Sequence, residues 1–141
     1  MPKSVTAPAE VQIPLRILHF REGIPGFENL TRFTLLQDEN LLPIVFLVAL
    51  EEPRISFPVV PIQRIRPDYA LRLSEEDRKA LELSGESKPG QDLLCLAILN
   101  LGEGAQPATA NLFAPVVVNL QTWTAKQVIQ FESSYSATAE V

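Results

Sequence analysis

Apolar and polar residues alternate along much of this chain with a period of two. From Val11 to Ile17 the apolar side chains occupy every second position, with polar residues or proline between them. This period is typical of a strand with one buried face. Pro14 lies on the outward phase and donates no backbone hydrogen bond, which favours an edge strand. The apolar set shifts by one residue at Leu18, and we expect a β-bulge there.

Further segments have the composition of short strands and are separated by turn residues. Residues 43–50, 92–100 and 111–120 are apolar on both phases, which predicts strands buried on both faces. The predicted strands are residues 32–37, 43–50, 55–61, 92–100, 111–120 and 126–131, with 68–73 as a further short strand. Such spacing predicts a mainly β fold. We predict a small antiparallel β-barrel of about seven or eight short strands, because closure removes exposed strand edges.

One segment differs and predicts a helix. Ser74 is followed three residues later by Asp77, which resembles a capping box, and the first turn is rich in acidic residues. Leu81 and Leu83 supply an apolar edge, and the glycines and proline of residues 84–91 end the pattern. We predict one short helix near residues 74–83.

The stretch FREGIPGFE, residues 20–28, predicts a rigid turn with an apolar tip. Gly23 and Gly26 accept a positive φ without steric cost, and Pro25 fixes its own φ and lacks an N–H group. Ile24 and Phe27 are the apolar residues at the tip. Either these two side chains close one end of the barrel, or the turn presents a preordered apolar surface to a partner.

Two other places offer the same alternatives. In NLFAP, Asn111 either shapes the entry to a strand or presents Leu112 and Phe113 to a partner. Trp123 lies in an expected hairpin turn. It either folds back onto the barrel or is exposed as a residue that dominates a binding interface.

The composition indicates one globular domain with an acidic surface. Of the 141 residues, 46% are hydrophobic and 21% are charged, which is normal for a domain with a core. We expect the barrel domain over residues 10–136, a flexible N-terminus or edge-strand start over 1–9, and a flexible tail over 137–141. The net charge of −5 argues against direct nucleic-acid binding and favours a basic protein partner.

Cysteine use and hydropathy indicate a cytoplasmic protein. Cys95 is the single cysteine, so an internal disulfide is excluded and a reducing compartment is favoured. No basic-then-apolar leader with a cleavage site is found, and no apolar run approaches the length of about 18 residues that spans a bilayer. We therefore expect no membrane association.

The residue types that carry catalysis are not assembled in this sequence. His19, the single histidine, lies in a strand pattern, and Cys95 lies in an apolar run, where a free cysteine acts as a small hydrophobe. The usual three or four zinc ligands are not available from one histidine and one cysteine. We expect a non-enzyme without cofactor or metal. The alternative is a small β-barrel enzyme or ligand-binding module with an internal polar pocket.

Four stretches, taken in order, resemble the FliW family, the flagellar assembly factors of bacteria. They are GIPGFE (23–28), LEEPRISFPVVP (50–61) with PDY (67–69), NLFAPVVVN (111–119) and KQVIQFESSYS (126–136). The resemblance covers nearly the whole chain and implies a small β-barrel that is monomeric when free.

The resemblance also implies a regulatory role in flagellum biogenesis. FliW-type proteins bind flagellin and the translational repressor CsrA, the carbon storage regulator, which is a small basic RNA-binding dimer. Flagellin that awaits export occupies the factor. Once flagellin is secreted, the free factor captures the repressor, antagonises it allosterically and relieves the repression of flagellin translation.

The chain departs from the family pattern at two places. Leu47, Val48 and Ala49 stand where the family commonly has Leu-Gln-Ser, and Ala125 replaces a common glycine. The first change removes two polar side chains from a possible contact surface. With the residues of the turn, of NLFAP and of the hairpin turn, the predicted partner-binding residues are Ile24, Pro25, Phe27, Val48, Ala49, Asn111, Leu112, Phe113 and Trp123.

Overall fold

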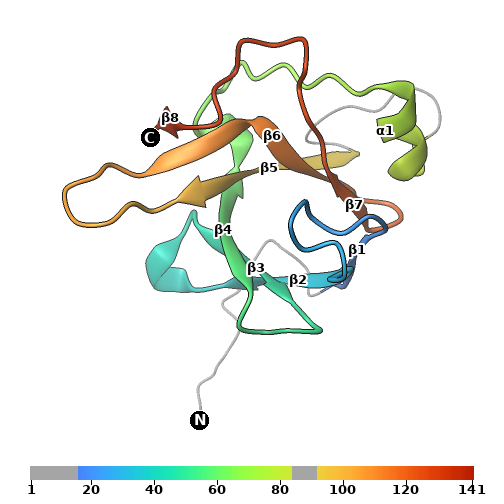
Figure 1. The fold of residues 1–141 in the computed structure, drawn as a ribbon, viewed down its shortest axis with the longest axis horizontal. Coiled ribbons are helices and arrows are strands. Elements are labelled where there is room, and N and C mark those ends of the chain that lie inside the picture. The colour runs from blue at the N-terminus through green and yellow to red at the C-terminus, as the bar shows by residue number, and fades with distance from the viewer. Residues whose placement is uncertain (1–15, 84–91) are drawn as a thin grey trace.

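The computed structural model describes residues 16–83 and 92–141, which form a mainly β structure (Figure 1). None of the helices in these ranges is long and apolar enough to cross a membrane. The elements are β1 (Leu18–Phe20), β2 (Arg32–Gln37), a 3-10 helix η1 (Glu39–Leu41), β3 (Val45–Ala49), β4 (Ser56–Pro61), a 3-10 helix η2 (Ile62–Arg64), α1 (Glu75–Ala80), β5 (Leu93–Asn100), β6 (Thr109–Asn119), β7 (Thr124–Gln127) and β8 (Ala139–Glu140).

Seven strands close into a barrel, as the sequence predicts. Their order is β5-β4-β3-β2-β1-β7-β6, pairing of β5 with β6 closes the ring, and β8 adds to β6. The predicted antiparallel pairing is present at the other neighbouring pairs of the ring, whereas β1 and β7 run parallel with His19 beside Thr124. A tight turn follows β6, and β7 runs antiparallel to β6. When the ring closes, β7 then lies beside β1 and runs in the same direction as β1.

The interior of the barrel is filled with apolar side chains. Phe20, Phe33, Leu47, Val59 and Val116 are completely buried there. The rings of Phe20 and Phe33 meet edge to face with centroids 4.9 Å apart, a favourable aromatic geometry. This packing gives no support to the alternative of an internal polar pocket.

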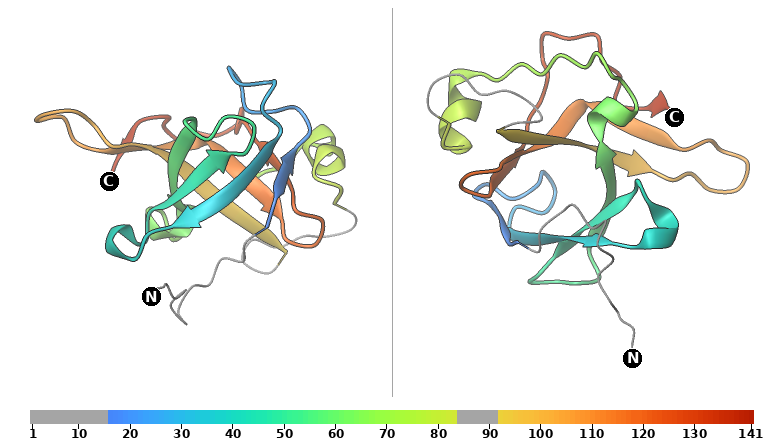
Figure 2. Two further views of the ribbon diagram at one scale, coloured as in Figure 1. Left: turned by 90° about the horizontal axis from the view of Figure 1, so that it is seen from below. Right: turned by 180° about the vertical axis from the view of Figure 1, so that it is seen from behind.

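A second core lies outside the barrel, on the outer face of β5 and β6. Cys95 and Val117 face outward and are covered by Ile62, Leu81 and Val128. Figures 1 and 2 show the segment between β4 and α1, and the segment after β7, passing over these strands. The prediction that β5 and β6 are buried on both faces is confirmed.

Two segments predicted as strands are not strands, or only in part, in the structure. Residues 68–73 contain no strand, and β7 ends at Gln127 although the prediction extended to residue 131. Gln130 is 3% exposed; its amide donates to Arg72 O and accepts from Arg72 N, both at 2.8 Å. The Tyr69 hydroxyl donates to Leu112 O at 2.6 Å. Side-chain groups thus hold Tyr69 and Arg72 in place of a backbone ladder, whereas Val128 N and Gln130 N still donate to carbonyls of β6.

The predicted helix is present but shorter at its C-terminal end. Ser74 caps α1, and its side chain and that of Asp77 form the reciprocal capping box. The helix ends at Ala80, and Glu82 has a φ of 58°, a left-handed conformation common just after a helix.

The structure describes the two ends of the chain to different extents. The alternating pattern at residues 11–15 and the expected segment 1–9 lie outside the described residues, and the described chain enters β1 at Leu18. Within the tail predicted over 137–141, Ala139 and Glu140 form β8 and pair with Ala110 and Thr109, and the flexibility of this tail stays a prediction.

Candidate functional site

A groove of about 670 Å3 lies outside the barrel, between the start of α1 and the chain that leaves β7. Residues of the stretch 72–77 line one side, residues of the stretch 126–133 line the other, and Glu22 and Pro25 complete the lining. The groove therefore joins two of the family-like stretches, GIPGFE and KQVIQFESSYS, which are far apart in the sequence.

An ion pair between the two sides helps to set the width of the groove. Lys126 Nζ lies 2.8 Å from Asp77 Oδ1 and 3.8 Å from Glu22 Oε1. Burial lowers the pKa of Lys126, but the hydrogen bond to Asp77 and the charges of Asp77, Glu22 and Glu76 outweigh it and raise this pKa. Lys126 is therefore a fixed cation at neutral pH.

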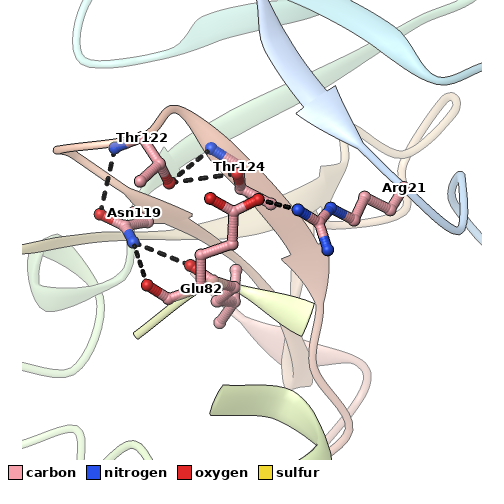
Figure 3. A network of polar contacts seen from close by, with 6 residues as sticks. Arg21, Glu82, Asn119, Thr122 and Thr124 are labelled. Carbon is pink, nitrogen blue, oxygen red and sulfur yellow. Dashed lines mark hydrogen bonds and ion pairs between the residues drawn. The ribbon is translucent and has the colours of Figure 1, made fainter. Parts of the chain in front are cut away.

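Helix α1 is also anchored at its other end by the turn between β6 and β7 (Figure 3). The Asn119 side chain is 3% exposed; its Nδ2 donates to Leu81 O at 2.8 Å, and its Oδ1 accepts from Gln121 N at 2.9 Å. Arg21 also pairs with Glu82. With both ends of α1 attached, the groove is preorganised, which lowers the entropy cost of binding.

The lining of the groove carries an excess of negative charge. Four carboxylates (Glu22, Glu76, Asp77, Glu132) face two cations (Arg72, Lys126). Both cations are already paired with lining carboxylates, Arg72 with Glu132 at 3.8 Å and Lys126 with Asp77 at 2.8 Å. The groove is thus electrostatically suited to a basic ligand.

Large apolar side chains are exposed at the same place. Phe131 is 78% exposed and Ile129 is 38% exposed, and both line the groove. An exposed phenylalanine beside a hollow surface is characteristic of protein-binding sites. The groove therefore offers an apolar contact surrounded by acidic groups.

The predicted contact residues in the turn of residues 20–28 differ in burial. Ile24 is 3% exposed, and Phe27 packs edge to face on Phe57 with centroids 5.4 Å apart. These side chains close one end of the barrel, which was the structural alternative. Of the three predicted contact residues in this turn, Pro25 is the exposed one, and it lines the groove.

Two more predicted contact residues have buried side chains. Ala49 is 0% exposed and faces the barrel interior, and Leu112 is 2% exposed in the outer core. Together with Ile24, they are core residues and offer a partner no exposed side chain. In contrast, Val48 is half-buried on the outer face of β3, opposite Thr34.

The remaining candidates have structural roles and are partly exposed. Asn111 Oδ1 accepts from Phe113 N and Ala114 N, both at 3.0 Å, so this asparagine shapes its strand, while Phe113 is half-buried. Trp123 has a φ of 61° and packs partly against the interior core, with Arg16 5.3 Å from its ring centroid. A partner contact for these residues stays a prediction.

Sequence reasoning missed Ile129 and Phe131, although a signal was present. In KQVIQF, Val128 and Gln130 share one phase, and Ile129 and Phe131 share the other. The first phase is buried against the outer core, so the second faces outward. The prediction of a strand over residues 126–131 did not separate its two faces, so this exposed apolar pair was not named.

Residues considered for catalysis occupy ordinary positions. His19 is exposed on β1. Cys95 is 3% exposed in the outer core, and burial raises the pKa of its thiol to about 12, as expected for a cysteine that acts as a hydrophobe.

The fold and the site together define the class of protein. It is a small closed β-barrel with a filled interior, and its candidate site is a preorganised groove on the exterior. The FliW protein family model matches residues 5–141, and this chain belongs to the FliW family. A relative from Pseudothermotoga lettingae, named flagellar assembly factor FliW, is 42% identical over 121 residues, which cover 85% of this chain and 74% of the relative. A relative of the same name from Thermosipho africanus is 35% identical over 120 residues, 84% of this chain and 80% of the relative.

A solved structure gives the same result at the level of the fold. The crystal structure of a flagellar assembly factor FliW superposes with a TM-score of 0.78 at 31% identity and covers 88% of this chain and 84% of its own. These relatives are named as assembly factors and not as enzymes.

Proposed function

We propose that this chain is a flagellar assembly factor that acts by binding flagellin and the translational repressor CsrA. Flagellin awaiting export occupies the factor, and after flagellin secretion the free factor captures the repressor and relieves repression of flagellin translation. Family membership supports the assembly role. The exchange between the two partners is the finer part of the proposal.

The observation that carries the proposal is the groove itself. Its lining combines the exposed Phe131 with an excess of carboxylates, and it unites the turn at Pro25 with the stretch 126–133. A preordered apolar surface with acidic neighbours suits a protein ligand, and in particular a basic one. The acidic excess also opposes direct contact with nucleic acid.

Isothermal titration calorimetry with purified repressor and purified flagellin tests this function. We expect both proteins to bind the wild-type chain, and repressor binding to weaken with added salt. Phe131→Ala should weaken at least one of the two associations. Leu36→Ala is the matched control, because Leu36 is 56% exposed on β2 and does not line the groove. Absence of binding to both partners would remove the proposal.

A further inference from the structure

The backbone edge of β7 that faces away from β6 is open beyond Ala125. On that side β1 pairs with β7 only at Thr124 and Ala125, because β1 ends at Phe20. The chain then enters the turn at Gly23. On the other side β6 pairs with β7 as far as Gln127. No other strand of the described residues lies along the open edge.

The direction of the peptide groups shows where this edge points. Val128 N donates to Pro115 O and Gln130 N donates to Phe113 O, both at 2.8 Å, so the pairing with β6 continues past the end of β7. Peptide groups of successive residues in an extended chain point to opposite sides. Those of Gln127 and Ile129 therefore point away from β6, towards the groove that both residues line.

The Ile129 amide is correspondingly free. Within residues 16–83 and 92–141, it donates to no acceptor, although the amides on either side of it are bonded to β6. A row of unpaired N–H and C=O groups is a template for an added strand. A short strand edge with a free amide thus borders the groove, with Phe131 and Ile129 exposed beside it.

The charges of the lining select the kind of strand that fits. Glu76 lines the groove and, among the described residues, has no cation within 4.0 Å. Glu22 and Glu132 are 66% and 84% exposed at their side chains, and the two lining cations are already paired. An incoming Lys or Arg would meet a lining with more carboxylates than cations, whereas an acidic segment would be repelled.

We propose that an extended segment of a basic protein partner adds to the open edge of β7. Its backbone pairs with Gln127 and Ile129, an apolar side chain packs on Phe131, and a flanking Lys or Arg lies near Glu76. This is strand addition, in which backbone bonds supply affinity and side chains supply selectivity. The inference rests on the proposed function, and of the two partners proposed there the repressor is the basic one.

Amide hydrogen exchange of the full chain, followed by NMR with and without the intact purified repressor dimer, tests strand addition directly. In the free chain, Ile129 should exchange fast, while Val128 and Gln130 are protected. In the complex, exchange at Ile129 should slow about tenfold or more, with little change at its two neighbours. These neighbours are the internal control, because their amides already face β6.

The outcomes separate the two levels of the proposal. If calorimetry shows a complex and Ile129 exchange is unchanged, strand addition is overturned and the proposed function stands. If neither the repressor nor flagellin binds, both are overturned. If Ile129 becomes protected in the chain alone as its concentration rises, a second copy occupies the edge, and the assignment to the basic partner fails.

A pair of variants at one position supplies a second test. Ile129→Ala keeps the amide and shortens the side chain, and Ile129→Pro removes the groove-facing amide. We expect the proline variant to bind the repressor about tenfold more weakly than the alanine variant. Glu76→Gln should weaken binding by about threefold, against no change for Glu39→Gln in η1. Equal binding by the proline and alanine variants, both folded, would contradict strand addition.

Discussion

Lys126 Nζ in β7 and Asp77 Oδ1 in α1 lie 2.8 Å apart and join the barrel to this helix. Their side chains are 19% and 13% exposed, so solvent screens the pair only partly. Because Asp77 also completes the capping box with Ser74, one carboxylate both starts the helix and fixes it to the strand. This pairing sets the two sides of the groove relative to each other.

Lys126→Met should destabilise the fold by about 2 kcal/mol, since it leaves the Asp77 carboxylate partly buried without its cation. The measurement is the free energy of unfolding from urea titrations at neutral pH. Lys79→Met is the matched control. Lys79 lies exposed in α1, the helix of Asp77, and its substitution should change the free energy of unfolding by less than about 0.5 kcal/mol. Equal effects of the two substitutions would show that the ion pair contributes nothing.

The contribution of Lys126 should depend on pH only at the alkaline end. Its pKa in the folded state is raised above the ordinary value of 10.5. A raised pKa of a base means that its stabilisation is complete below the unfolded value and is lost as pH rises through the folded value. The stability difference between wild type and Lys126→Met should therefore stay constant from pH 7 to about pH 9 and shrink above about pH 10.5.

Gly23→Ala should destabilise the fold more than Gly26→Ala, although both glycines have positive φ. A Cβ on Gly23 would lie 2.6 Å from Glu28 Cα, whereas a Cβ on Gly26 would meet nothing within 4 Å. The φ values of 67° and 90° make some strain common to both. We expect a loss of about 1 kcal/mol for Gly26→Ala and about 3 kcal/mol for Gly23→Ala. Thermal unfolding of the two variants measures this difference.

Asn119→Ala should loosen the C-terminal end of α1. The substitution leaves the buried Leu81 carbonyl and the Gln121 amide without their side-chain partner. Such a loss costs about 1–3 kcal/mol. Asn29→Ala is the control, because Asn29 is exposed just after the turn of residues 20–28. It should have almost no effect on the urea midpoint. An unchanged midpoint for Asn119→Ala would contradict the anchoring role of this side chain.

Cys95 should resist thiol reagents in the folded protein. Its side chain is buried, and burial raises its pKa to about 12, so the reactive thiolate is scarce at pH 8. A disulfide reagent should therefore modify Cys95 only on unfolding, and Lys126→Met should speed the reaction by the factor by which it raises the unfolded fraction. Fast modification of the folded wild type would show that the outer core opens at this strand.

Local patterns predicted the elements whose neighbours in the sequence determine them. Residues 32–37 form β2 with the predicted bounds, and the capping box at Ser74 gives the predicted helix start. Both depend on side-chain period or on contacts within one turn. Burial of β5 and β6 on both faces was likewise visible as continuous apolar runs.

Long-range pairing was hidden from the sequence. The parallel pair of β1 and β7 results from closure of the ring, and no residue pattern in either strand specifies it. Gln130 holds Arg72 through side-chain bonds across 58 residues, so two segments that read as strands are irregular. The groove lies between these segments, which is why its exposed residues were missed while Pro25 alone was found.

A competition titration tests the central claim, that this chain works by exchanging protein partners on its exterior. Labelled repressor is held at saturation with the purified chain, and flagellin is added while the bound repressor is measured by fluorescence anisotropy. We predict that flagellin releases the repressor and that the midpoint shifts in proportion to repressor concentration. A repressor signal that flagellin leaves unchanged, or no complex with either protein, would contradict the account.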